Sequence, residues 1–179
     1  MAKANSSSSL IPKDLPSELL PIAQEVDRLH ESAMWSGQGQ FEQAKLWRAM
    51  NALLGIPAAT LAAVAGGTSL AATEMTYTPG VLALLAAGFG AALTTLNPSR
   101  RVAQAQAAAN AYLSLQTDTR QLLTIDLVGL NADDARQQLQ EITSRRDEVN
   151  RTAEPPSWYA HWRARQNIEK GRQSYDADA

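Results

Sequence analysis

The sequence predicts an all-α protein, a two-transmembrane helical hairpin with a cytoplasmic helical bundle, and three observations support this fold class. Residues 52–72 and 79–96 are two closely spaced segments without a charged side chain. The segments before and after them are polar and carry apolar residues at helical spacing. A helix that is apolar on every side needs lipid or a large protein interior around it. A soluble Ala-rich hairpin buried in a core is the alternative, but both segments would then need a protein shell, and much of the rest of the chain is polar.

The first predicted helix starts at Ser17, with Pro16 and Pro21 near its beginning. Its apolar residues follow one another at steps of three and four: Leu19, Ile22, Val26, Leu29 and Ala33. This stripe requires a partner helix. Gly37 and Gly39 are poor helix formers, so we expect residues 36–39 to interrupt the helix and a second helix to begin near Gln40.

The two uncharged segments have the length of membrane spans. At about 1.5 Å per residue, residues 52–72 form a helix about 30 Å long, which matches the hydrocarbon core of a bilayer. Residues 79–96 are at the lower end of this length, and Asn97 extends their reach. We therefore predict a transmembrane hairpin over residues 49–98.

Basic residues near the span ends predict the orientation. Lys45 and Arg48 precede the first span, and Arg100 and Arg101 follow the second. The connection at 73–78 holds only Glu74 as a charged residue, so we expect it outside and both termini in the cytoplasm.

Two aromatic residues fit the interfaces of the same membrane. Trp47 is expected at the inner interface and Tyr77 at the outer one, where amphipathic rings are favoured. The four basic residues are expected to anchor the inner interface on membrane lipid. A nucleotide phosphate is an alternative ligand for Arg100 and Arg101.

After the hairpin, a long helix is predicted from Pro98 to about Leu127. Asn131 is a predicted N-cap, with Asp133 and Asp134 in the first turn of the next helix. A last short helix carries Trp158 and Trp162, which we expect to pack onto the cytoplasmic bundle. The predicted division of the chain is a disordered tail at 1–13, cytoplasmic helices at 14–48, the hairpin at 49–98, cytoplasmic helices at 99–172 and a tail at 173–179.

Five short segments carry a resemblance to a known family. They are residues 44–48 (AKLWR), 54–59 (LGIPAA), 96–101 (LNPSRR), 107–113 (AAANAYL) and 153–156 (AEPP). Together with the order of the elements, over roughly residues 20–172, this layout resembles the SLATT family, the two-transmembrane effector domains associated with SMODS nucleotidyltransferases and SLOG sensors.

The resemblance implies a bacterial protein with a helical hairpin in the inner membrane. It also implies a pore-forming effector of an anti-phage conflict system, which permeabilises the membrane on a signal and kills or arrests the cell. No sensor or nucleotidyltransferase domain is fused to the sequence, so the signal is expected to bind the helices or to come from a separate signalling or sensor protein.

Small residues recur at steps of four along both spans: Ala59, Ala63 and Gly67 in the first, and Ala86, Gly90 and Thr94 in the second. Such spacing lets membrane helices approach closely. These faces can pack the two spans on each other, or one face can pack between subunits of a homo-oligomer.

Hydroxyl side chains and one proline are the remaining features of the spans. Thr60, Thr68, Thr94 and Thr95 either bond back to the preceding turn or line a wetted pore. Pro57 is expected to bend or break the first span near its inner end, as a tolerated bend or as a gating hinge.

The sequence offers no recognisable enzyme site. It has no cysteine, and its two histidines are far apart, so we expect no catalytic residue, no metal and no cofactor. With 16 basic and 18 acidic residues, the charge balance gives no case for nucleic acid. The leading hypothesis is a homo-oligomeric pore effector, and a membrane-anchored scaffold that recruits a soluble partner is the alternative.

Overall fold

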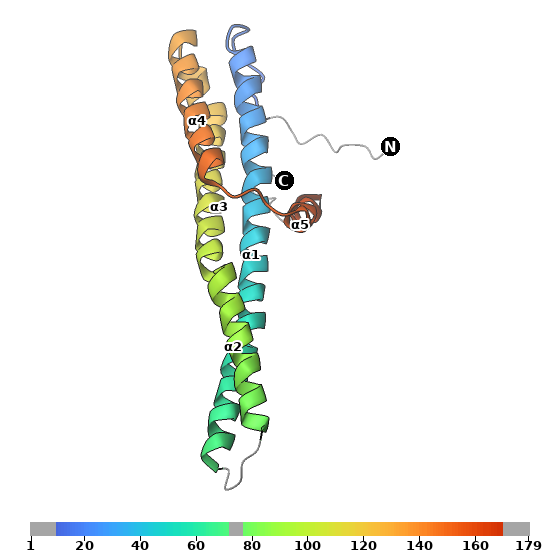
Figure 1. The fold of residues 1–179 in the computed structure, drawn as a ribbon. Helices are drawn as coiled ribbons and strands as arrows, with labels where there is room; N and C mark the ends of the chain where they lie inside the picture. Colours follow the sequence, from blue (N-terminus) through green and yellow to red (C-terminus); the bar gives the residue numbers. More distant parts are fainter. Residues whose placement is uncertain (1–9, 72–76, 170–179) are drawn as a thin grey trace. The chain divides into compact units, whose positions relative to one another are not determined.

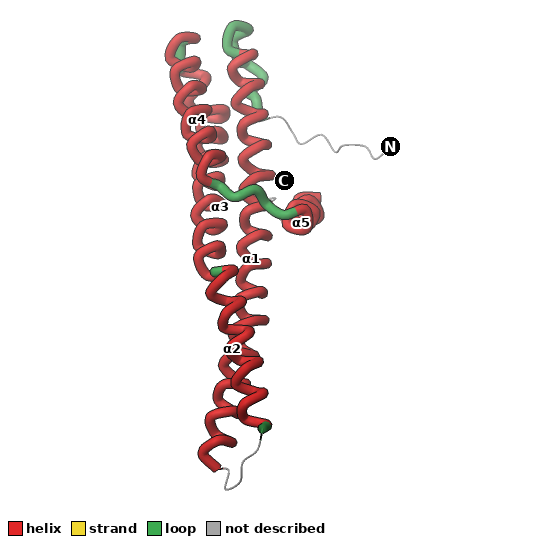
Figure 2. Tube along the Cα trace, in the orientation of Figure 1, coloured by secondary structure: helices red, strands yellow, loops and turns green. Residues whose placement is uncertain are grey.

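The structure is a computed structural model that describes residues 10–71 and 77–169. These residues form helices and turns without a strand (Figure 1, Figure 2). In chain order the elements are α1 (Leu20–Ala71), α2 (Thr78–Leu96), α3 (Pro98–Gln121), a π-helical turn (Leu122–Asp126), a 3-10 turn (Leu127–Gly129), α4 (Ala132–Thr152) and α5 (Trp158–Glu169). The all-helical class predicted from the sequence is confirmed.

Helix α1 runs without a break through the segment 36–39, so the predicted interruption and the separate helix from Gln40 are wrong. The glycines there allow close packing instead. A Cβ atom on Gly37 would lie 3.3 Å from the Cβ of Tyr112, and one on Gly39 would lie 3.3 Å from the Cγ of Pro156. Each glycine costs a helix about 1 kcal/mol, and each lets a neighbouring side chain lie close to α1.

The residues before Gln43 and after Gln104 form one compact unit. Within it, the first half of α1 lies beside α3 and α4 (Figure 1). The predicted stripe on α1 is confirmed as the core face, since Leu19, Val26, Leu29 and Ala33 are buried and Ile22 packs against them. The other elements contribute buried Tyr112, Leu115, Leu122, Leu123, Leu127, Ala135 and Ile142 to the same core.

The chain joins this core earlier than predicted. Leu10 and Ile11 pack against the core, and so does Leu15 before α1 begins. The prediction of disorder over residues 1–13 is therefore wrong for its last residues, because Leu10 and Ile11 pack on the apolar core. Residues 1–9 and the predicted tail at 173–179 lie outside the described residues.

The predicted cap of α4 is confirmed. The side chain of Asn131 accepts a hydrogen bond from the backbone N–H of Asp134 at 2.8 Å. Farther along α4, Arg145 contacts Asp118 of α3 at 2.8 Å and Arg146 donates to Ser32 of α1 at 3.1 Å. The first contact joins α4 to α3 and the second joins α4 to α1, so both are polar interactions between helices of the bundle.

Helix α5 meets the rest of this unit through small side chains. Ala160 and Ala164 are buried, whereas Trp158 is 81% exposed and Trp162 is 47% exposed. The prediction that the two tryptophans pack α5 onto the bundle is thus wrong. The turn before α5 is held by Gln40, whose Nε2 donates to the carbonyl oxygen of Glu154 at 2.7 Å.

Residues Gln43–Gln104 form the second compact unit, which comprises the end of α1, α2 and the start of α3. Asn97 joins α2 to α3 in a left-handed conformation, with φ 44° and ψ 55°. Asparagine is one of the few residues with a Cβ that tolerate this region. Its N–H bonds to the carbonyl oxygen of Leu93 at 2.9 Å, and buried Pro98 then starts α3 with a suitable φ.

Candidate membrane hairpin and its flanking residues

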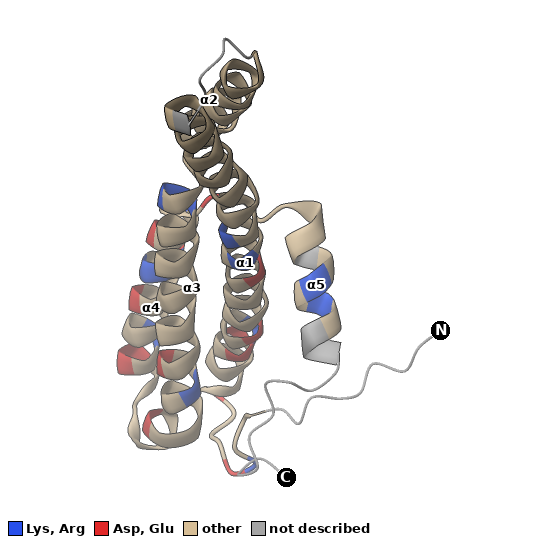
Figure 3. Cartoon of the chain, turned by 90° about the horizontal axis from the view of Figure 1, so that it is seen from below, with Lys and Arg blue, Asp and Glu red and all other residues tan. Residues whose placement is uncertain are grey.

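Two helices, starting at Leu20 and Thr78, are long and apolar enough to cross a membrane. Of the most apolar window in each, only 6% is buried in the first and none in the second. Figure 3 shows that charged residues gather on the first half of α1 and on α3, α4 and α5, whereas α2 carries none. The core helix of a soluble protein would be mostly buried, so this exposure fits a lipid-facing hairpin better.

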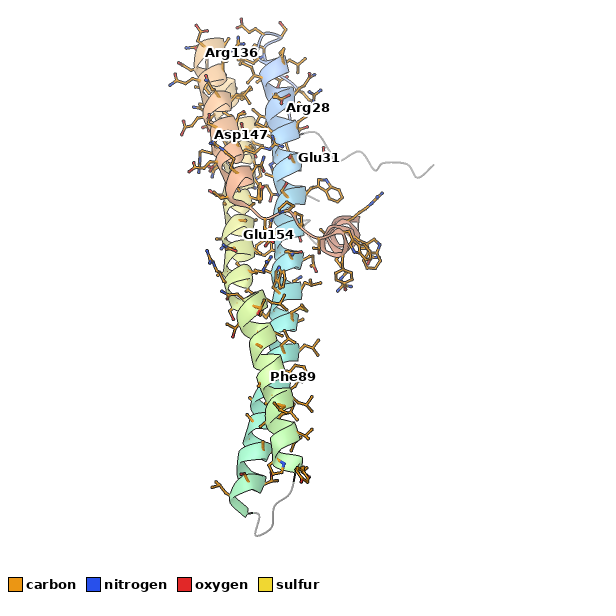
Figure 4. All side chains as sticks on the ribbon, viewed as in Figure 1. Arg28, Glu31, Phe89, Arg136, Asp147 and Glu154 are labelled. Atoms are coloured by element: carbon orange, nitrogen blue, oxygen red, sulfur yellow. The ribbon has the colours of Figure 1, made fainter. Side chains whose placement is uncertain are left out.

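The helical parts outside these two windows expose charged side chains. Arg28 and Glu31 on α1 and Arg136 and Asp147 on α4 are all exposed (Figure 4). Such faces require water. Phe89, also labelled in Figure 4, belongs instead to the uncharged hairpin.

The two spans face each other across a shallow groove of about 630 Å³. Its walls are small residues: Ala58, Ala62, Ala65, Gly66 and Ser69 on α1, and Pro79, Gly80, Ala83, Ala86 and Ala87 on α2. Ala65 is buried there with 6% exposure. The structure thus brings Ala86, one of the predicted packing residues, to the inside of the hairpin.

The predicted stripe on the first span lies elsewhere. Ala59, Ala63 and Gly67 are exposed, and a Cβ on Gly67 would meet nothing within 4 Å. They are thus offset by one residue, about 100° of helix rotation, from Ala58 and Ala62, which line the groove. Gly90 on α2 also has open space around it. Sequence spacing alone did not separate these two faces because alanines occupy both.

All four threonine hydroxyls of the spans bond to their own helix. Thr60 donates to Ile56 at 2.8 Å, Thr68 to Val64 at 2.8 Å, Thr94 to Gly90 at 3.0 Å and Thr95 to Ala91 at 2.9 Å, in each case to the carbonyl oxygen one turn back. This was one of the two alternatives for these residues. It allows a hydroxyl to face lipid without an unpaired proton.

Helix α1 continues through Pro57, so the proline does not end the first span. Proline has no backbone N–H, and the carbonyl oxygen of Leu53 therefore lacks the usual partner four residues on. The alternatives of a tolerated bend and a gating hinge both remain predictions.

The end of the first span that carries Trp47 and the end of the second that carries Leu96 meet at an aromatic and basic cluster. The guanidinium of Arg101 lies 4.7 Å from the ring centroid of Trp47, within the range of a cation–π contact. Arg101 also donates from Nε to the carbonyl oxygen of Leu96 at 3.2 Å, and Ser99 donates to the Oδ1 of Asn51 at 3.2 Å. Arg101 therefore connects the start of α3 to α1 through its contact with Trp47.

The other predicted anchors are placed around this cluster or at the far end. Lys45, Arg48 and Arg100 are exposed, as contact with lipid headgroups requires. Tyr77 is 92% exposed at the start of α2. The rest of the predicted outer connection, Thr73 to Thr76, lies outside the described residues.

A second cavity, of about 600 Å³, opens in the helical bundle and was missed by the sequence reasoning. Trp35, Ser36 and Gln40 of α1 line it together with Tyr112, Pro156 and Trp158. The hydroxyl of Tyr112 donates to the Oδ1 of Asn150 at 2.6 Å, and burial raises the pKa of Tyr112. The sequence signal for this cavity was the pair of glycines that bring α1 close to Tyr112 and Pro156.

His30 ties α1 to α3 inside the bundle. Its Nδ1 lies 3.0 Å from the carbonyl oxygen of Gln116 and 3.1 Å from the hydroxyl of Thr119. Thr119 already donates to the carbonyl oxygen of Leu115 at 2.8 Å, so its oxygen is left to accept. Nδ1 therefore carries the proton and donates, and burial lowers the pKa of this ring despite the bond to Gln116.

Over residues 10–71 and 77–169, no group of three or more His, Asp or Glu side chains is placed to hold a metal ion. Comparison of the chain with protein-family models, with curated proteins and with solved structures gave no match.

Proposed function

We propose that this chain is a pore-forming effector of a bacterial anti-phage system. Its hairpin lies in the inner membrane with both termini in the cytoplasm, and several copies assemble to permeabilise that membrane on a signal. One observation carries the proposal: α1 and α2 present two uncharged segments in which almost no residue is buried in the single chain. Such a surface is stable in lipid and not in water.

Assembly follows from the size of the hairpin. Two helices cannot enclose an aqueous path, so a pore requires more than one copy. The face of Ala59, Ala63 and Gly67 points away from the groove of its own hairpin and has room for a second helix. Membrane helices associate by close packing of small residues of this kind.

The chemistry of the spans favours a weakly selective pore. Residues 52–71 and 78–96 hold no ionisable side chain, so they contain neither a proton relay nor a charged selectivity ring. The threonine hydroxyls are bonded to backbone oxygens but keep oxygen lone pairs that water can reach in an open state.

Control of the pore is assigned to the helical bundle outside the membrane. A signal opens the assembly if it binds the open arrangement more tightly than the closed one. The resemblance to the SLATT family supports a signal linked to a nucleotidyltransferase or delivered by a sensor protein. The cavity beside Trp35 and Tyr112 is available to such a signal.

Dye release from liposomes tests this function. The purified full chain is reconstituted into dye-loaded liposomes and exposed to lysate from phage-infected cells or from uninfected cells. Release that requires both the protein and the infected lysate supports the proposal. Absence of release in every condition, with an intact membrane potential on overexpression in cells, contradicts it.

A membrane-anchored scaffold is the second candidate. It is favoured by the hydrogen bonds of Thr60, Thr68, Thr94 and Thr95 to their own helices, because hydroxyls held in this way are also suited to a hairpin that only anchors. A scaffold would release no dye and would instead retain a soluble partner on the membrane.

A further inference from the structure

Helix α5 carries an aromatic face that stays partly or largely exposed among the residues that the structure describes. Trp158 is 81% exposed, Tyr159 is 40% exposed and Trp162 is 47% exposed. The three rings contact one another in sequence, with centroids 6.2 Å apart for the first pair and 6.1 Å for the second. Figure 4 shows aromatic side chains of α5 projecting away from α1.

Burial against the rest of the chain does not explain these aromatic residues. Among the α5 side chains that the structure describes, the buried ones are Ala160 and Ala164, which fill little volume. Exposing two tryptophans to water is unfavourable, and a tryptophan side chain buries a large apolar area when it finds a partner. The face therefore has the character of a contact surface.

We propose that α5 rests on the headgroup region of an anionic membrane surface, with its aromatic rings inserted at the interface. The inference rests on the membrane placement of the proposed function. Tryptophan and tyrosine are favoured at that depth because each ring has an apolar body and a polar edge. A short helix with such a face lies in the plane of the interface rather than across the bilayer.

The charges of α5 fit anionic lipid. Arg163 and Arg165 are both exposed and follow the aromatic residues directly in sequence. Arg163 reaches Glu42 of α1 at 4.0 Å, yet half of its side chain stays exposed to meet a phosphate. Basic residues near an anionic membrane surface are attracted to it.

The attachment of α5 also lies near the predicted membrane in sequence. Glu42, which contacts Arg163, precedes Arg48, the last charged residue before the uncharged segment of α1. Gln40, which holds the turn at Glu154, precedes it too. Helix α5 and the turn before it thus contact α1 at Gln40 and Glu42, which precede the uncharged segment in the sequence.

Tryptophan quenching in nanodiscs tests this contact. The sequence has four tryptophans, so the double variant Trp35→Phe and Trp47→Phe leaves only the two on α5. The full-length variant is placed in nanodiscs of phosphatidylcholine and phosphatidylglycerol, with or without lipid brominated near the top of its acyl chains. We expect a roughly twofold loss of emission with brominated lipid, because rings at the interface lie close to those atoms.

A matched variant tests whether the hairpin is in the membrane independently of whether α5 contacts the membrane surface. Trp35→Phe with Trp158→Phe and Trp162→Phe leaves only Trp47, which the membrane placement puts at the inner interface. Quenching of Trp47 without quenching of the α5 tryptophans overturns the inference and keeps the hairpin in the membrane. Absence of quenching in both variants overturns the membrane placement as well.

The lipid composition tests the electrostatic part. Quenching of the α5 tryptophans should weaken when phosphatidylglycerol is replaced by phosphatidylcholine, because Arg163 and Arg165 then lose their anionic partners. Equal quenching in both lipids contradicts a role for these arginines. Quenching that requires an added soluble protein assigns the aromatic face to a protein partner and also contradicts the proposal.

Discussion

The substitution Gly67→Leu tests how the hairpins assemble. In the single chain, a Cβ at position 67 meets nothing within 4 Å, so a side chain can begin there without a clash. The substitution also removes a glycine from the interior of α1, which favours the helix by roughly 0.8 kcal/mol. The variant should therefore insert and fold as well as the original chain.

In the proposed assembly the same leucine would separate two helices that pack on Ala59, Ala63 and Gly67. Overfilling a packed contact typically costs about 1–3 kcal/mol. Each 1.4 kcal/mol is a factor of about ten in affinity, so we expect association between subunits to weaken roughly 5- to 150-fold. Dye release should fall in parallel, since it depends on the assembled form.

The size of the particle in detergent, measured by light scattering, gives the result directly. Gly88→Leu is the matched control, because Gly88 also has open space around it but lies off the stripe of Ala86 and Gly90. We expect Gly67→Leu to shift the population toward single chains and Gly88→Leu to leave it unchanged. Equal size for both variants over a range of concentrations would refute packing through Gly67.

Three further predictions concern the helical bundle, each measured by thermal unfolding in detergent. Leu122→Ala should lower the free energy of unfolding by about 2–5 kcal/mol because Leu122 is only 1% exposed, whereas Ile125→Ala, at a 67% exposed position of the same turn, should have little effect. Tyr112→Phe loses the 2.6 Å hydrogen bond to Asn150, which should lower the free energy of unfolding by about 0.5–1.5 kcal/mol; an unchanged melting temperature would contradict this. Burial lowers the pKa of His30 below its ordinary 6.5, so the unfolded chain binds a proton at higher pH than the folded one and stability should fall as the pH drops below 6.5; His30→Gln should flatten this dependence.

Helical periodicity predicted the bundle well because its signal is local. The stripe from Leu19 to Ala33 and the capping residue Asn131 both depend on residues within a few positions of each other. The uncharged segments 52–72 and 79–96 were likewise visible from composition alone, and their described residues lie in the long apolar helices α1 and α2.

The errors arose where tertiary packing outweighs local propensity. Gly37 and Gly39 are weak helix formers, yet α1 passes through them, and an added Cβ would lie only 3.3 Å from Tyr112 and from Pro156. Leu10 and Ile11 follow a serine-rich run, and only the bundle surface makes them part of the core. No pattern within twenty residues contains this information.

The candidate membrane hairpin was predicted only in part, again because some of its contacts depend on tertiary packing. Spacing identified small residues on both spans but not which face closes the hairpin, since Ala58 and Ala59 are equivalent in composition. The contact between Trp47 and Arg101 joins two ends of the hairpin, and the exposed face of α5 depends on which side its alanines bury. Both require the three-dimensional arrangement.

The most direct test of the central claim is the sidedness of the hairpin. The sequence has no cysteine, so Tyr77→Cys and Ser144→Cys each introduce a single thiol at an exposed position. In intact spheroplasts, a membrane-impermeant maleimide should label the Tyr77→Cys variant at once and the Ser144→Cys variant only after lysis. If the Tyr77→Cys variant stays unlabelled until lysis and the protein remains in the aqueous fraction without detergent, the hairpin does not cross the membrane.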